Sequence, residues 1–102
     1  MKKVLKKGSI ISITGRRWFD RSAGNTYHSV LVVVNGQVIG VDNFKYGYDE
    51  GYLQTAWALI WEKFKPCKGL NPTFLPWWQL KEFYRINETV SDVSRKKDLT
   101  FS

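Results

Sequence analysis

Residues 26–41 contain two runs rich in apolar, β-branched side chains, and Asn35 and Gly36 separate the two runs. An Asn-Gly pair between two β-branched runs is the strongest short-range signal for a two-residue β-hairpin. The antiparallel register predicts the pairs Val34 with Gln37, Val32 with Ile39 and Val30 with Val41. These residues then share one face with His28 and Asn43, whereas Tyr27, Val38, Gly40, Asp42 and Phe44 lie on the other face.

Three further segments have the periodicity of regular structure. Residues 9–19 predict a first strand, so that with residues 26–34 and 37–44 they form an antiparallel meander. Residues 49–64 predict an amphipathic helix, whose apolar stripe consists of Leu53, Trp57, Ile60, Trp61 and Phe64. After a proline-containing connector, residues 77–87 predict a shorter helix from the spacing of Trp77, Leu80, Phe83 and Tyr84, and residues 89–93 can add a short strand.

The expected fold class is therefore α+β, with a three- or four-stranded antiparallel sheet packed by one main helix and a shorter C-terminal helix. The 102 residues fit a single domain, with a basic arm over residues 1–8 and a basic tail over residues 95–102 that can be flexible. One register of the first strand places Ile11 and Ile13 on the valine side under the main helix. The same register places Arg16 and Trp18 beside Tyr27 on the opposite side, and a slip of one residue would exchange the two faces.

Charge and aromatic content narrow the class of partner. Sixteen Lys and Arg against nine Asp and Glu give a formal charge of +7, and aromatic residues make up 16% of the chain. A positive balance favours an anionic partner such as nucleic acid or an acidic protein face. The apolar stretch that follows the basic start is interrupted by Gly8 and Ser9, so we expect no signal peptide. With no apolar run of about 18 residues, we expect a cytoplasmic protein with no membrane partner.

Candidate binding residues lie in the first hairpin and on the sheet. Arginine next to flat aromatic rings suits phosphate pairing and stacking on unpaired bases. The predicted nucleic-acid or partner site consists of Arg16, Arg17, Trp18, Arg21, Tyr27 and Phe44.

Structural interpretations of the same residues remain open. The second helix, with Trp77, Trp78 and Tyr84, can cover the Tyr27 side and make it a second core layer. The arginines can simply be a solvated hairpin tip. Two terminal clusters, Lys2, Lys3, Lys6 and Lys7 at one end and Arg95, Lys96 and Lys97 at the other, can extend an electrostatic footprint or only be solvated.

No catalytic or metal-binding pattern stands out. His28 is the only histidine, and the alternation places Asp42 on the opposite face, so a structural histidine is favoured over a general base. Cys67 is the only cysteine; its neighbours Lys65 and Lys68 do not supply a base that would make it a nucleophile. We therefore expect no enzyme activity, no cofactor and no metal, and keep a small nuclease that uses His28 only as a third hypothesis.

Two segments, GRRWFDRSAGNTYHSVLVVVNGQ and FKYGYDEGYLQTA, resemble a group of small proteins of unassigned activity encoded by tailed bacteriophages and related mobile elements. The two segments are residues 15–37 and 44–56, about a third of the chain. It implies a setting in the bacterial host cytoplasm and carries over no catalytic residue. Our first hypothesis is binding of DNA or RNA through the arginine and aromatic residues. The alternative is a non-enzymatic inhibitor or modulator of a host enzyme or defence protein, anchored by Tyr, Trp and Arg side chains.

Overall fold

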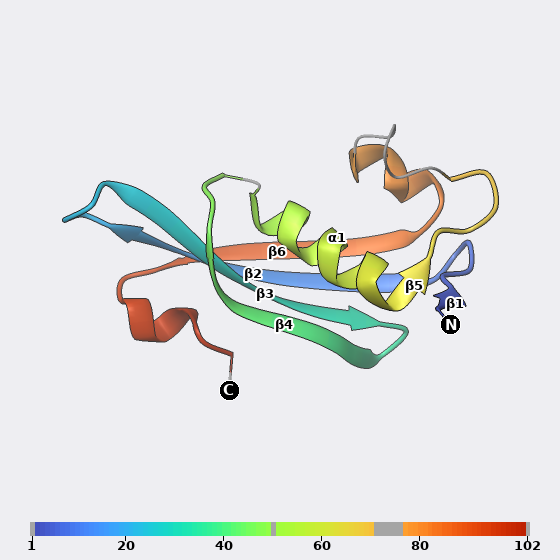
Figure 1. The fold of residues 1–102 in the computed structure, drawn as a ribbon, viewed down its shortest axis with the longest axis horizontal. Coiled ribbons are helices and arrows are strands. Elements are labelled where there is room, and N and C mark those ends of the chain that lie inside the picture. Colours follow the sequence, from blue (N-terminus) through green and yellow to red (C-terminus); the bar gives the residue numbers. More distant parts are fainter. Residues whose placement is uncertain (1, 50, 71–76, 102) are drawn as a thin grey trace.

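A four-stranded sheet with one α-helix across a single face makes up most of the chain (Figure 1). The computed structural model describes residues 2–49, 51–70 and 77–101. Its elements, in chain order, are β1 (Lys3–Val4), β2 (Ile10–Asp20), β3 (Asn25–Val34), β4 (Gln37–Tyr46), α1 (Gly51–Lys63), β5 (Phe64–Lys65), the 3-10 turn η1 (Trp77–Glu82), β6 (Arg85–Val93) and the 3-10 turn η2 (Lys96–Leu99). The main sheet has the order β4-β3-β2-β6, and β1 pairs with β5 in a small parallel sheet. The α+β class is thus confirmed.

The predicted hairpin turn is confirmed at Asn35 and Gly36. Their φ angles of 50° and 82° are both positive, as a type I′ turn between two strands requires. The turn is also tied to β2, since the Asn35 amide donates to the carbonyl of Ile10 at 2.8 Å and the Asn35 side-chain oxygen accepts from the Ile10 amide at 2.9 Å. One turn therefore fixes three strands relative to one another.

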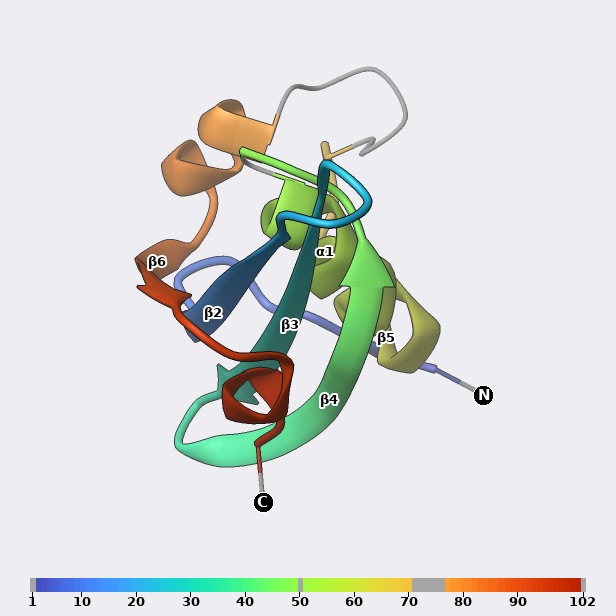
Figure 2. The ribbon, with the colours of Figure 1, turned by 90° about the vertical axis from the view of Figure 1, so that its left-hand side faces the viewer.

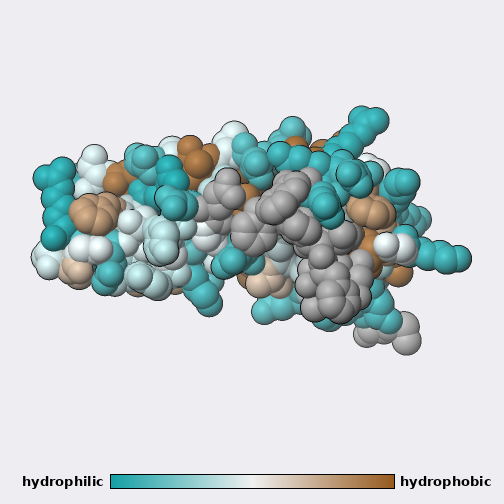
Figure 3. Space-filling model, turned by 90° about the horizontal axis from the view of Figure 1, so that it is seen from above, coloured by the Kyte–Doolittle hydropathy of each residue, from teal (hydrophilic) through white to brown (hydrophobic). Residues whose placement is uncertain are grey.

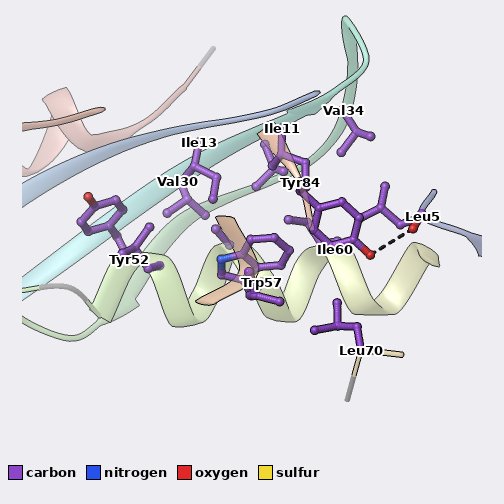
Figure 4. Packing of buried hydrophobic residues seen from close by; sticks show 14 of the residues in the cluster. Leu5, Ile11, Ile13, Val30, Val34, Tyr52, Trp57, Ile60, Leu70 and Tyr84 are labelled. Atoms are coloured by element: carbon purple, nitrogen blue, oxygen red, sulfur yellow. Dashed lines mark hydrogen bonds between the residues drawn. The ribbon is translucent and has the colours of Figure 1, made fainter. Parts of the chain in front are cut away.

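The predicted register of β2 on β3 is correct, and the core lies where it was expected. Ile11 pairs with Val34 and Ile13 with Val32, on the face that α1 covers. The buried residues on these strands include Ile11, Ile13, Val30, Val32 and Val34, and those on α1 include Tyr52, Leu53, Ala56, Trp57 and Ile60 (Figure 4). Trp61 and Phe64 from the predicted stripe pack against this cluster while partly buried.

The predicted pairing of β4 is wrong beyond the turn. Val32 pairs with Gly40 rather than Ile39, and Val30 pairs with Asp42 rather than Val41. Irregularities of the ladder between Val32 and Val33 and between His28 and Val30 account for the shift, because a bulge adds a residue to one strand and exchanges the faces beyond it. Val41 consequently points away from α1, whereas Gly40 lies beside Leu59 of the helix.

The predicted second helix over residues 77–87 is also wrong. Only residues 77–82 form a helical turn, and Arg85–Val93 is a full strand that pairs in parallel with β2, so the sheet is mixed rather than antiparallel. The apolar spacing still identified core residues, since Leu80 and Tyr84 are both 3% exposed. A parallel partner requires a crossover, which the segment containing α1 and η1 provides (Figure 1).

Tyr84 joins the predicted N-terminal arm to the rest of the core. Its hydroxyl donates to the carbonyl of Leu5 at 3.0 Å and accepts from the amide of Cys67 at 3.2 Å (Figure 4). Burial raises the pKa of the Tyr84 phenol, so the hydroxyl keeps the proton that it donates. Leu5 is 2% exposed, which places the end of the basic arm within the folded core.

The close packing of α1 on β2 gives a test of this arrangement. A Cβ atom at Gly15 would lie 2.6 Å from Cδ2 of the buried Tyr52 ring, so Gly15→Ala forces the helix or the ring to shift. We expect the free energy of unfolding in urea to fall by about 1–3 kcal/mol, the usual cost of overpacking.

Gly40→Ala is the matched control for this substitution. It places the same methyl group under the same helix, but its nearest neighbour, Leu59, is 3.5 Å away, an ordinary van der Waals distance. We expect a change within about 1 kcal/mol in either direction. Equal destabilisation by both variants would contradict the packing of Tyr52 on Gly15.

Candidate nucleic-acid interface

Three aromatic rings stand in a row across β2, β3 and β4 on the side of the sheet away from α1. The ring centroids of Trp18 and Tyr27 are 5.9 Å apart with an interplanar angle of 26°, and those of Tyr27 and Phe44 are 4.6 Å apart at 18°. Tyr46 meets Tyr27 edge-on, with centroids 5.7 Å apart. The structure therefore brings together the three aromatic members of the predicted site.

The stacking within the row limits what the rings can bind. Because β3 lies between β2 and β4, Trp18 and Phe44 approach Tyr27 from opposite sides and cover both faces of its ring. A nucleotide base therefore cannot lie flat on Tyr27 as the sequence led us to expect. Phe44, at the end of the row, is 45% exposed, which makes it the most exposed of the three rings, and it stacks on another ring of the row with one face only.

The predicted covering of this face by the second helix does not occur. Leu80 and Tyr84 pack on the α1 side, where the Tyr84 ring lies 6.3 Å from Trp57. The side chains of Trp77 and Trp78, which belonged to the same prediction, lie outside the described part of the chain.

The C-terminal segment covers part of the face instead. Figure 2 shows η2 against the side of the sheet opposite α1. Leu99 is 1% exposed, and its carbonyl accepts a hydrogen bond from the buried Ser29 hydroxyl at 2.5 Å. The Phe101 amide donates to the side-chain oxygen of Asn43 at 2.8 Å. The segment that was expected as a flexible tail is thus packed on β3 and β4.

Arg16, a predicted binding residue, fastens this segment to the sheet. Its guanidinium donates to the carbonyls of Asp98 at 3.3 Å and Thr100 at 2.8 Å, and it lies 4.1 Å from the ring centroid of Phe101. These contacts combine charge-assisted hydrogen bonds with a cation–π interaction. In the folded chain the Arg16 guanidinium is therefore occupied by contacts within the protein.

The other two arginines do not join Arg16. Arg17 points to the α1 side, where it pairs with the Asp92 carboxylate at 2.9 Å and donates to the Asp49 carbonyl at 3.3 Å. Arg21 is exposed in the β2–β3 turn and makes no hydrogen bond or ion pair with the described residues. The predicted cluster of three arginines at the hairpin tip is thus dispersed over two faces and the turn.

Asp20 organises that turn. Its carboxylate accepts from the hydroxyl of Ser22 at 2.7 Å and from the Ser22 amide at 3.0 Å. The Ser22 hydroxyl is the main cause of a lowered pKa at Asp20, and the positive charge of Lys96 adds to the effect. The turn is therefore held by an ionised carboxylate at its start.

Two lysines of η2, Lys96 and Lys97, lie next to the end of the aromatic row, a proximity that local sequence patterns do not predict. The Lys96 ammonium is 4.9 Å from the ring centroid of Phe44. Together with Asn43, Lys97 and Thr100 these residues line an open groove of about 590 Å³. Lys96 and Lys97 were recognised only as part of a terminal basic cluster, because local sequence cannot show that η2 folds back onto β4. Their position makes this groove, the Phe44–Lys96 groove, the candidate interface.

His28 and Cys67 are both buried and do not line this groove. His28 is 1% exposed, its Nδ1 donates to the carbonyl of Gly47 at 3.1 Å, and its Nε2 bonds the hydroxyl of Thr55 at 2.7 Å. A carbonyl only accepts, so Nδ1 carries a proton. Cys67 is 7% exposed. Across residues 2–49, 51–70 and 77–101, no three His, Cys, Asp or Glu side chains are grouped as metal ligands would be.

No family model matches the chain, no curated protein matches it, and no solved structure matches it. Among the described helices, none combines the length and the apolar character needed to cross a membrane.

The contribution of Arg16 to folding stability can be tested by comparing it with the exposed Arg21. Arg16→Gln removes the cation that binds two carbonyls and the Phe101 ring, so we expect the free energy of unfolding to fall by about 1–3 kcal/mol. Arg21→Gln makes the same change in the exposed turn and should alter it by less than about 0.5 kcal/mol. Urea unfolding measures both, and equal values would contradict the role of Arg16.

Proposed function

We propose that this protein binds single-stranded nucleic acid, without enzymatic activity, at the Phe44–Lys96 groove. The observation that carries the proposal is the placement of an ammonium group 4.9 Å over an exposed phenyl ring, beside a second lysine. Lysine neutralises phosphate, and an exposed aromatic ring offers a surface for an unpaired base. The groove therefore holds the two chemical groups that recognise a nucleotide.

The proposal favours unpaired over paired nucleic acid. A base within a duplex has both faces covered by its neighbours, so only an unstacked base can reach Phe44. The self-stacked row behind Phe44 supports its ring from one side through the 4.6 Å contact with Tyr27. A base stacks on the outer face of this supported ring when the Lys96 ammonium, 4.9 Å from the ring centroid, turns from the ring to a phosphate.

The net charge of +7 supports the same partner class. A positive chain attracts a polyanion over distances comparable with the Debye length, about 8 Å at physiological ionic strength. The three arginines of the predicted site contribute less to nucleic-acid binding than expected. Arg16 and Arg17 make contacts within the protein, so only Arg21, in the β2–β3 turn, is available to a ligand. We also propose that the protein acts in the bacterial host cytoplasm, because its sequence resembles those of phage-encoded proteins.

The test is fluorescence anisotropy with labelled single-stranded DNA and RNA over a range of salt. Lys96→Gln with Lys97→Gln removes two cations from the groove, so the slope of log affinity against log salt should become less steep by about 1.4, at roughly 0.7 per phosphate contact. Affinity at low salt should fall by at least about tenfold, or about 1.4 kcal/mol.

Lys63→Gln with Lys68→Gln is the matched control. It removes the same charge from exposed lysines outside the groove, on α1 and in the loop that follows β5. Its slope should stay close to that of the unmodified chain. Equal losses in the two double variants would mean that binding is diffuse. The absence of any binding to random DNA or RNA at low salt would reject the proposal in favour of a protein partner.

A further inference from the structure

The half of the sheet nearest the Asn35-Gly36 turn is bare on the side away from α1. The strand registers place five apolar side chains on it: Ile10, Leu31, Val33, Val38 and Val41. Val38 is 59% exposed, Ile10 46% and Val41 39%. The C-terminal segment reaches only the other half of the face, around Arg16 and Ser29 (Figure 1). Contiguous exposed apolar patches of this kind mark interaction sites.

The bulge in β4 makes this patch larger. With a regular ladder, Gly40 would face away from α1 and Val41 would face the helix. The shift at Val33 reverses these positions, so that the residue without a side chain lies under α1 and the valine points outward. A bulge that turns a valine from a covered face to an uncovered one is expected where the uncovered face has a use.

Charge is missing from the same face. Between Arg85, which lies beside Ile10, and Arg16, which is bound to the C-terminal segment, the described residues facing this way are uncharged. On β2 and β6 they are Ser12, Thr14, Asn87 and Thr89. By contrast, hydrophilic side chains are spread along the length of the α1 side (Figure 3). A chain with 25% charged residues thus leaves the part of this face between Arg85 and Arg16 without a charge.

We propose that this face binds the same face of a second copy of the chain. An acidic partner would gain little from a patch whose cations, Arg85 and Arg16, lie only at its two ends, whereas two copies that each carry +7 can approach only where they bring few like charges together. A two-fold axis makes the contact self-complementary, with two sheets packed face to face at about 10 Å. The lysines of both copies then remain in solvent at the rim.

The size of the face sets the expected strength. Four strands about 4.8 Å apart, with about five residues each at roughly 3.3 Å, span roughly 300 Å². A standard interface buries about 800 Å² per partner, so this one is weak. We expect a dimer that forms at protein concentrations of about 0.1 mM and dissociates on dilution. This inference is independent of the proposed nucleic-acid binding, which uses the other half of the face.

The experiment is sedimentation velocity on the full chain, free of nucleic acid, from about 0.01 to 1 mM, a range that brackets the expected dissociation constant. The weight-average mass should rise from 11.9 kDa towards twice that value. Val41→Glu should raise the dissociation constant at least about tenfold, because dimerisation would bury an unpaired charge. Val38→Glu should do the same, and its exposed position makes it a second variant with an unchanged fold, verified by circular dichroism.

The control is Val90→Glu, which makes the same change at an exposed valine that lies opposite Gly15 and so faces the α1 side. It should leave the dimer intact, as should the paired substitution of Lys96 and Lys97 by glutamine. All three glutamate variants lower the net positive charge, so greater repulsion cannot explain a loss of dimer. A monomer at every concentration, a dimer that resists Val41→Glu and Val38→Glu, equal loss with Val90→Glu, or assembly beyond a dimer would each overturn the proposal.

Discussion

The Asn35-Gly36 turn is the constraint on which the rest of the structure depends. Both residues adopt positive φ, which joins β3 to β4 with a two-residue loop, and the turn's hydrogen bonds to Ile10 align β2 with the same pair. This alignment decides which side chains meet α1 and which face the other way. The apolar core follows from it, and together with the bulges of the β3–β4 ladder it places the aromatic row and the apolar patch on the opposite face.

The C-terminal segment divides the side of the sheet away from α1 into two chemically different halves. Arg16 donates to two carbonyls of this segment, and Ser29 donates to the carbonyl of Leu99. The Leu99 side chain is buried. The same contacts that occupy the Arg16 cation bring Lys96 to the ring of Phe44. The face is thereby divided into a basic, aromatic half beside η2 and an apolar half beside the turn. The two proposals assign one half to nucleic acid and the other to a second copy.

Local patterns in the sequence predicted the hairpin, the first three strands, the core side of β2 and the main helix, because turn chemistry and periodicity determine these features. They failed where distant contacts decide. The strand expected over residues 89–93 is present, but pairing with β2 extends it over Arg85–Val93, into the end of the segment predicted as a second helix. The bulges in β4 leave no clear sequence signal. The Phe44–Lys96 groove could not be predicted, since it joins two segments far apart in the chain.

The most direct test of the central claim, that the side of the sheet away from α1 is the binding side, is an NMR titration of the labelled chain with single-stranded oligonucleotide. We expect the backbone amide shifts to concentrate at Phe44, Lys96 and Lys97, with little change along Gly51–Lys63 of α1. Shifts that concentrate on α1, or that spread evenly over all exposed lysines, would contradict it.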